Sequence, residues 1–260
     1  MELYGLIGHP LGHSFSARLF NDAFRSAKAD ARYELFDIAS VEALPHLLEN
    51  TPELKGLNVT IPYKESVIPY LDRVSDAARE IGAVNCIGIG IDSESGRRIL
   101  TGHNTDAAGF ADSISPLLRP DITSSLVLGT GGASKAVCHA LKGRGILPVT
   151  VSRCPGKGNL TYSHLTRSVI EAHRLIINTT PLGMWPDTTS APELPYPYIT
   201  SAHICYDLVY NPEVTRFMSH CATQGAEVCN GLAMLRSQAA NAARIWRLPD
   251  SIANHIVNCH

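Results

Sequence analysis

The chain reads SLVLGTGGAS at residues 125–134, and this stretch decides the fold. Residues 125–128 are typical of a short buried strand, and the glycine-rich turn after them leads into a helix with an apolar face at residues 136–141. Glycines in this context allow close approach to a pyrophosphate, whose charge the N-terminus of the helix favours. The pattern predicts a dinucleotide-binding loop made by Gly129, Gly131, Gly132 and Ala133. Because Ser134 replaces the third glycine of the general fingerprint, a glycine-rich turn without a ligand is the alternative.

Further strands are expected after this loop, at residues 148–152, 175–178, 204–209 and 227–229, with helical segments between some of them. Strands that alternate with helices indicate a parallel sheet covered by helices, here a Rossmann-type domain. The second of these strands ends without an acidic residue that could accept from a ribose 2′-hydroxyl. It offers Ser152, Arg153 and Lys157 instead, which suit a 2′-phosphate and favour NADP over NAD. Two solvated cations on a loop are the alternative.

The first hundred residues also show alternating strand and helix signals. Strands are expected at 3–7, 32–38, 54–61, 83–91 and 98–101, and helices near 19–27, 41–48 and 74–81. Ser16 is placed to cap the first helix. Two helices, at 232–246 and 249–257, close the chain, and residues 185–197 form a proline-rich surface loop whose length suggests a lid or a binding role.

The strand at 54–61 ends in an unusual polar set, NVTIPYK at residues 58–64. Pro62 has no N–H group and a fixed φ, so the strand must stop or turn there. Asn58, Thr60 and Lys64 therefore emerge at the carboxyl end of the strand, where open α/β sheets bind ligands. This set suits an oxygen-rich small molecule, with Lys64 as a candidate proton donor. An exposed, solvated lysine is the alternative.

Composition excludes several other classes of function. The 260 residues carry a formal net charge of −2, with 45% hydrophobic and 18% charged residues, so no broad basic surface for nucleic acid is expected. No stretch is long and apolar enough for a membrane span, and the N-terminus lacks the basic region of a signal peptide. The seven cysteines form no C-x-x-C pair and the histidines lack zinc-ligand spacing, which indicates no metal site and a reducing, cytoplasmic location.

Other polar residues are ambiguous one by one. Asp106 could act as a cap-like acid at a helix start, and Ser14 and Ser16 as caps of the helix after them. Asn85 could satisfy a turn, whereas Gln238, in an alanine-rich helix, would need hydrogen-bond partners if it faced inward.

Taken in order, these motifs resemble the shikimate dehydrogenase family along essentially the whole chain. The matching segments are 4–16 (YGLIGHPLGHSFS), 58–64 (NVTIPYK), 82–85 (GAVN), 104–106 (NTD), 178–184 (NTTPLGM), 206–212 (YDLVYNP) and 231–235 (GLAML) with Gln238. The resemblance implies reversible, NADP-dependent reduction of 3-dehydroshikimate to shikimate, in the biosynthesis of chorismate and aromatic amino acids. Cys154, where a threonine is more usual, and Leu208, where a methionine is common, depart from the family pattern.

The resemblance also implies roles for matching residues. Lys64 and Asp106 would be the catalytic pair, Lys64 stabilising or protonating the reacting oxygen and Asp106 orienting Lys64. Substrate contacts would come from Ser14, Ser16, Asn58, Thr60, Asn85, Tyr210 and Gln238. Besides the residues already given for the pyrophosphate and the 2′-phosphate, cofactor contacts would come from Thr179, Leu208 and Gly231.

For architecture, we expect an N-terminal α/β substrate domain and a Rossmann-type domain with a cleft between them. Residues 1–103, completed by the helices at 232–260, would form the first, and 104–231 the second. A quinate/shikimate dehydrogenase that uses NAD is one rival, and a catalytically silent sensor of pathway metabolites is another. The oligomeric state, monomer or homodimer, is left open.

Overall fold

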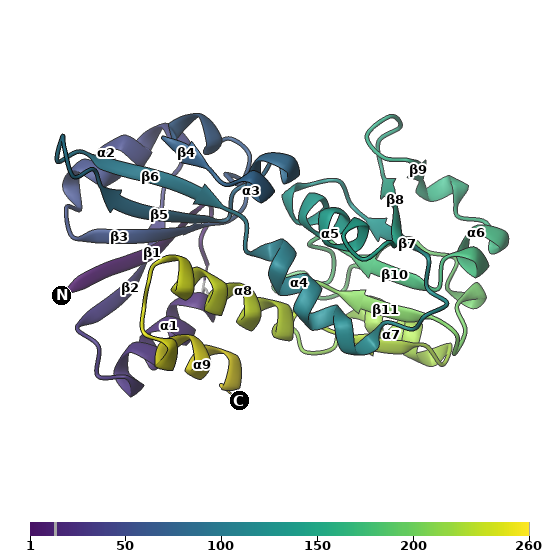
Figure 1. The fold of residues 1–260 in the computed structure, drawn as a ribbon. Coiled ribbons are helices and arrows are strands. Elements are labelled where there is room, and N and C mark those ends of the chain that lie inside the picture. The colour runs from purple at the N-terminus through teal and green to yellow at the C-terminus, as the bar shows by residue number, and fades with distance from the viewer. Residues whose placement is uncertain (13–14, 260) are drawn as a thin grey trace. The chain divides into compact units, whose positions relative to one another are not determined.

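The computed structural model describes residues 1–12 and 15–259 and forms two compact units (Figure 1). The first unit consists of Met1–Gly109 and Arg236–His260, and the second of Phe110–Leu235. The boundaries therefore fall inside the helices α4 (Asp106–Ile114) and α8 (Leu232–Ile245). The sequence placed them at 103/104 and 231/232. Asp106 thereby belongs to the same unit as Lys64.

The first unit contains a six-stranded mixed sheet in the order β2-β1-β3-β5-β6-β4. β1 is parallel to β2 and β3, whereas β5 is antiparallel to both β3 and β6. A short turn joins β5 and β6 as a hairpin. The strands are β1 (Glu2–Gly8), β2 (Ala31–Asp37), β3 (Leu54–Val59), β4 (Arg73–Val74), β5 (Cys86–Ile91) and β6 (Arg98–His103). The helices are α1 (Phe15–Ser26), α2 (Leu44–Asn50), α3 (Asp76–Ile81) and α9 (Asp250–Asn258), with 3₁₀ turns η1 (Val41–Ala43) and η2 (Ile68–Tyr70).

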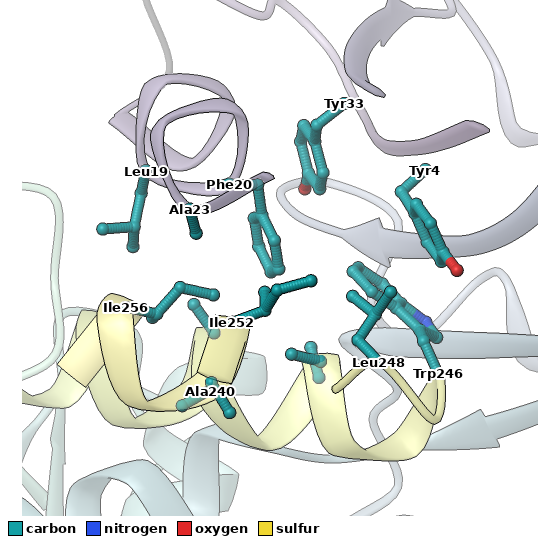
Figure 2. Packing of buried hydrophobic residues seen from close by; sticks show 14 of the residues in the cluster. Tyr4, Leu19, Phe20, Ala23, Tyr33, Ala240, Trp246, Leu248, Ile252 and Ile256 are labelled. Atoms are coloured by element: carbon teal, nitrogen blue, oxygen red, sulfur yellow. The ribbon is translucent and has the colours of Figure 1, made fainter. Parts of the chain in front are cut away.

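Both faces of this sheet are buried, as the alternation in β1 shows. Tyr4 and Leu6 pack into a cluster with residues of α1, α8 and α9, and Leu3 and Ile7 pack on the opposite face with residues of η1 and α2. Figure 2 shows the first cluster, in which Trp246 lies beside the ring of Tyr4 (centroids 5.0 Å apart). The alanines of α8 in this cluster, Ala239, Ala240, Ala242 and Ala243, are therefore core.

The second unit contains a six-stranded, all-parallel sheet in the order β12-β11-β10-β7-β8-β9. Numbered from β7, this is the 3-2-1-4-5-6 order of doubly wound dinucleotide-binding folds, so the expected fold class is confirmed. The strands are β7 (Ser124–Leu128), β8 (Leu147–Ser152), β9 (Leu160–Thr161), β10 (Leu175–Asn178), β11 (Ile204–Asp207) and β12 (Glu227–Cys229). The helices are α5 (Gly132–Lys142), α6 (Arg167–Ala172) and α7 (Arg216–Thr223), with 3₁₀ turns η3 (Ser115–Leu117), η4 (Tyr162–His164) and η5 (Tyr196–Tyr198).

Several elements differ from the sequence-based expectation. β3 ends at Val59 rather than Ile61, and α1 starts at Phe15, so Ser16 lies within its first turn and is not the cap. The short strands β4 and β9 and the helix α6 were not expected, because two or six residues carry too little periodicity. Within the loop 185–197, Leu194 is buried in the core of the second unit. Among the residues described, no helix is both long and apolar enough to span a membrane.

Candidate functional site

A part-buried ion pair joins the segment after β3 to the start of α4. Lys64 Nζ donates to Asp106 Oδ2 at 2.6 Å, and the two side chains are 17% and 8% exposed. The Lys64 carbonyl accepts from the N–H of Val84 at 2.7 Å, which fixes the backbone beneath the lysine. An ammonium group has three donors, so Lys64 can hold Asp106 and still donate to a ligand. The solvated lysine proposed as the alternative is wrong.

Asp106 is available for this pair because the side chain of another residue accepts the hydrogen bond from a backbone N–H group at the start of α4. Asn104 Oδ1 accepts from the N–H of Ala107 at 3.1 Å, and Asn104 Nδ2 donates to the Ala83 carbonyl at 2.9 Å. Asn104 therefore serves as the cap that the sequence analysis had considered for Asp106. The carboxylate of Asp106 lies in the first turn of α4, where the helix dipole favours negative charge.

Amide side chains beside the ion pair form a continuous hydrogen-bonded chain. Asn58 Nδ2 donates to the Asn85 carbonyl at 3.2 Å, and Asn85 Nδ2 donates to Thr105 Oγ1 at 2.9 Å. Thr105 Oγ1 lies 3.3 Å from Gln238 Oε1, which brings α8 to the network. Thr105, a residue to which the sequence analysis gave no role, thus links Asn85 to Gln238, and Asn58 joins them at the Asn85 backbone. The position of Thr105 directly before Asp106 was the available signal.

The other residues expected to contact substrate are Thr60, Ser16, Ser14 and Tyr210. Thr60 follows β3, with its N–H donating to the Ile7 carbonyl at 2.9 Å. Ser16 lies in the first turn of α1 and is partly buried. Ser14 lies outside the described residues. Tyr210 belongs to the second unit, in the segment after β11, and burial raises its pKa.

The electrostatics of the site leave Asp106 next to a neutral thiol. Burial, and to a smaller degree the charge of Asp106, raise the pKa of Cys86 far above its usual range. Because Cys86 stays protonated, it adds no negative charge beside the carboxylate. The Lys64 ammonium group pairs with the Asp106 carboxylate in the contact at 2.6 Å.

In the second unit, the glycine loop connects β7 to α5. Gly129 has φ +117°, a conformation that L side chains rarely adopt, and a Cβ there would meet Thr179 Oγ1 at 2.7 Å. A Cβ at Gly131 would meet nothing within 4 Å, so open space lies beside the backbone where a ligand could approach. Ser134 Oγ donates to the Gly129 carbonyl at 2.7 Å. The replacement of the third glycine therefore braces the loop, and the residues present fit a pyrophosphate at the N-terminus of α5.

The loops after neighbouring strands converge at the switch point between β7 and β10. Thr179 donates to the Leu128 carbonyl through its N–H (3.0 Å) and its hydroxyl (2.7 Å). A Cβ at Gly231 would lie only 2.0 Å from the Leu208 carbonyl oxygen, so these two predicted cofactor residues touch through their backbones. Crevices at such switch points are where doubly wound sheets bind ligands.

The end of β8 carries the predicted phosphate-binding set. Ser152 is buried, and its Oγ accepts from the N–H of Cys154 at 3.1 Å. Arg153 and Lys157 are exposed, and the Lys157 N–H donates to the Cys154 carbonyl at 3.3 Å within the same turn. The turn therefore carries two cations and no carboxylate.

A buried carboxylate missed by the sequence analysis ties these loops together. Asp207 Oδ1 accepts from Asn178 Nδ2 at 2.9 Å and from the Val209 N–H at 3.0 Å, and Oδ2 accepts from Thr215 Oγ1 at 2.6 Å. Asn178 Oδ1 in turn accepts from the Thr180 N–H at 3.0 Å. Asp207 closes β11 in the motif YDLVYNP, where an acid that ends a buried strand was the available signal.

The stability of the chain should depend on pH through Asp207. Burial raises the pKa of this carboxyl to about 6, although its hydrogen bonds act in the opposite direction and lower the pKa. The unfolded chain releases this proton first as the pH rises, so folded-state stability is lost between about pH 4 and 6. The stability of wild type relative to Asp207→Asn should fall by about 2–3 kcal/mol over this interval and stay level above it. Urea denaturation at each pH measures this difference. Parallel pH profiles for the two proteins would contradict the assignment.

Comparisons with known proteins agree with this geometry. The family model for the shikimate dehydrogenase substrate-binding domain matches residues 6–87. The chain is 37% identical, over 94% of its length and 91% of the relative's, to the shikimate dehydrogenase (NADP(+)) of Caldanaerobacter subterraneus subsp. tengcongensis. It is 38% identical to the enzyme of that name from Clostridium beijerinckii, over 95% of this chain and 92% of the other. The crystal structure of shikimate 5-dehydrogenase from Thermus thermophilus in complex with NADP(H) and shikimate matches with a TM-score of 0.82 and 32% identity, over 98% of each chain.

Proposed function

The chain belongs to the shikimate dehydrogenase family, and we propose that it catalyses the reversible, NADPH-dependent reduction of 3-dehydroshikimate to shikimate. The observation that carries the proposal is the Lys64–Asp106 pair, which lies beside the amide chain in the unit that contains the segment matched by the family model. The reaction belongs to the biosynthesis of chorismate and aromatic amino acids, as the name of the family implies.

Lys64 and Asp106 are the proposed catalytic pair. NADPH supplies the hydride for reduction of the ketone, and the protein must stabilise the alkoxide that develops on the reacting oxygen. Lys64 is suited to this task, because its ammonium group has donors beyond the one given to Asp106. Asp106 holds the ammonium group in place through the contact at 2.6 Å. Either proton transfer from Lys64 or stabilisation of the charge by Lys64 satisfies this arrangement.

The substrate is a polyhydroxy acid, and the proposed contacts divide by chemistry. Asn58, Thr60, Asn85 and Gln238 offer amide and hydroxyl groups for the ring hydroxyls and the reacting oxygen. The carboxylate is assigned to Ser14, Ser16 and Tyr210. The first unit is accordingly the proposed substrate domain and the second the cofactor domain.

The cofactor is NADP, and its proposed binding residues follow the fold of the second unit. Gly129, Gly131, Gly132 and Ala133 hold the pyrophosphate at the start of α5. Ser152, Arg153 and Lys157 hold the 2′-phosphate. Thr179, Leu208 and Gly231 line the crevice toward the nicotinamide.

A cytoplasmic location is proposed as well, on the chemistry of the cysteines. All seven cysteines lie among the described residues, and all are free. Free cysteines in this number suit a reducing compartment.

An assay of the purified chain tests the proposed activity. With shikimate and NADP at alkaline pH, we expect formation of NADPH, followed by its absorbance, and a much slower reaction with NAD at the same concentration. Preference for NAD, with turnover of quinate, would favour the NAD-using rival. Thermal stabilisation by shikimate without any NADPH formation would favour a sensor of pathway metabolites.

A further inference from the structure

In the proposed substrate site, neighbouring groups fix the orientation of two buried side-chain amides. A backbone carbonyl can only accept a hydrogen bond and a backbone N–H can only donate one. Wherever one end of an amide faces such a group, the identity of that end is fixed, and so is the identity of the other. Asn58 and Asn85 both meet this condition.

Asn58 faces the Asn85 carbonyl oxygen at 3.2 Å, so the atom on that side must be Nδ2. Its other end, Oδ1, then faces the hydroxyl of Tyr33 at 2.9 Å, and Tyr33 must be the donor. One N–H of the Asn58 amide is used by the carbonyl. Within the part of the chain that the structure describes, no group takes the second N–H, which is therefore available to a ligand.

Asn85 is fixed in the same way from the opposite side. Its Oδ1 accepts from the backbone N–H of Thr105 at 2.7 Å, and its Nδ2 donates to Thr105 Oγ1 at 2.9 Å. One N–H of this amide likewise remains. Both amides therefore use their oxygens inside the protein and offer donors to a ligand.

Tyr33 is built to keep its donor in place. Its ring stacks on that of Phe20, with centroids 4.7 Å apart and an interplanar angle of 2°. Both side chains are labelled in Figure 2. Its backbone exchanges two hydrogen bonds of 2.9 Å with the Asn21 side chain, which ties β2 to α1. Burial, with a smaller contribution from Cys86, raises the pKa of Tyr33 well above its usual range, so the hydroxyl keeps its proton.

We propose that Tyr33 is a positioning residue for the substrate: its buried hydroxyl donates to Asn58 Oδ1 and so presents the Asn58 amide to the ligand as a donor. A substrate hydroxyl bound there accepts a hydrogen bond from the Asn58 amide, so it is recognised as an acceptor. The proposal rests on the proposed function, because it takes Asn58 as a substrate contact. Tyr33 itself lies behind Asn58 in the hydrophobic core of the first unit.

Tyr33→Phe is the direct test, because it removes the hydroxyl and keeps the stacked ring. Without the donor, Asn58 Oδ1 loses this partner, and the amide is held only by the contact of its Nδ2 with the Asn85 carbonyl at 3.2 Å. We expect the KM for shikimate to rise about tenfold, with the KM for NADP unchanged and kcat within about twofold, as for loss of a buried hydrogen bond that holds a ligand-binding group. The effect should vanish in an Asn58→Ala background, since the hydroxyl acts only through that amide.

Tyr4→Phe is the matched control. Tyr4 lies in the same cluster (Figure 2) and is as buried as Tyr33. Its hydroxyl donates to Glu2 at 2.9 Å rather than to a site residue. A rise in the KM for shikimate confined to Tyr33→Phe and absent from Tyr4→Phe supports the proposal. Equal effects of the two variants, an unchanged KM in Tyr33→Phe, or a full Tyr33→Phe effect in the Asn58→Ala background would each overturn it. Failure of the wild-type chain to oxidise shikimate would instead contradict the proposed function itself.

Discussion

Replacing Lys64 or Asp106 by alanine should lower kcat for shikimate oxidation by about 10²–10⁴-fold or more, the range for loss of a positioned acid–base group. On the proposed roles, Lys64→Ala removes the cation that would lie next to the reacting oxygen. Asp106→Ala leaves that cation without the contact of 2.6 Å that holds it. Steady-state assays with saturating NADP and shikimate measure both losses. The affinity for NADP should stay unchanged, because the residues assigned to it belong to the second unit.

A loss of activity could also come from unfolding. Measurements of stability distinguish unfolding from a loss of catalysis, because the two charges of the pair are largely removed from solvent. Removing Lys64 leaves Asp106, which is 6% exposed, as an uncompensated carboxylate. Losing one partner of a fully buried pair costs roughly 3–5 kcal/mol, and the cost here should lie below that range because Lys64 is only partly buried. The double variant Lys64→Ala/Asp106→Asn carries neither charge, so it should recover most of this stability and none of the turnover. Lys55→Ala, an exposed lysine on β3, is the matched control and should leave both properties unchanged. Turnover near the wild-type value in Lys64→Ala or Asp106→Ala would remove these residues from catalysis.

The sequence predicted the parts of the fold whose signals are local. The loop at 129–134 lies between a buried strand and an amphipathic helix. Each of these two elements has a characteristic pattern of apolar residues, and together they predict the doubly wound unit. The strand ending near Lys64 was predicted for the same reason, with an error of two residues at its end. Boundaries inside α4 and α8 could not be predicted, because a continuous helix carries no mark of the unit to which each turn belongs.

The candidate site was predicted as a set of residues but not as an arrangement. The resemblance supplied Lys64 and Asp106 together, and the structure brings them into contact across 42 positions of the chain. Tyr33 and Thr105 were given no role, because a tyrosine in an alternating strand and a threonine before a helix have ordinary structural explanations. The role proposed for Tyr33, and the place of Thr105 in the network, depend on which end of an amide each faces, and this depends on segments far apart in the sequence.

The cofactor preference should reside in the two exposed cations at the end of β8. In the double variant Arg153→Ala/Lys157→Ala, kcat/KM with NADP should fall about 100-fold, while kcat/KM with NAD stays within about twofold. A hydrogen bond to a charged group contributes about 1.5–3 kcal/mol, and both side chains are exposed, so about tenfold for each is the expected share. The preference for NADP in the wild-type chain should also weaken as salt rises, because exposed charges are screened. Initial rates with each cofactor at two salt concentrations measure both effects.

The control for this variant must remove the same net charge from the same unit. Lys142→Ala/Arg167→Ala does so, with an exposed lysine that ends α5 and an exposed arginine that begins α6 and pairs with Glu171 at 2.8 Å. If long-range attraction of the anionic cofactor set the preference, both double variants would lose it equally. Loss only in Arg153→Ala/Lys157→Ala means that the cations bind the 2′-phosphate directly, since this phosphate is what distinguishes NADP from NAD. A parallel fall in kcat/KM with NAD would instead place the two side chains at a part of the cofactor common to both, and the selectivity for NADP would then have to come from Ser152 and the backbone around it.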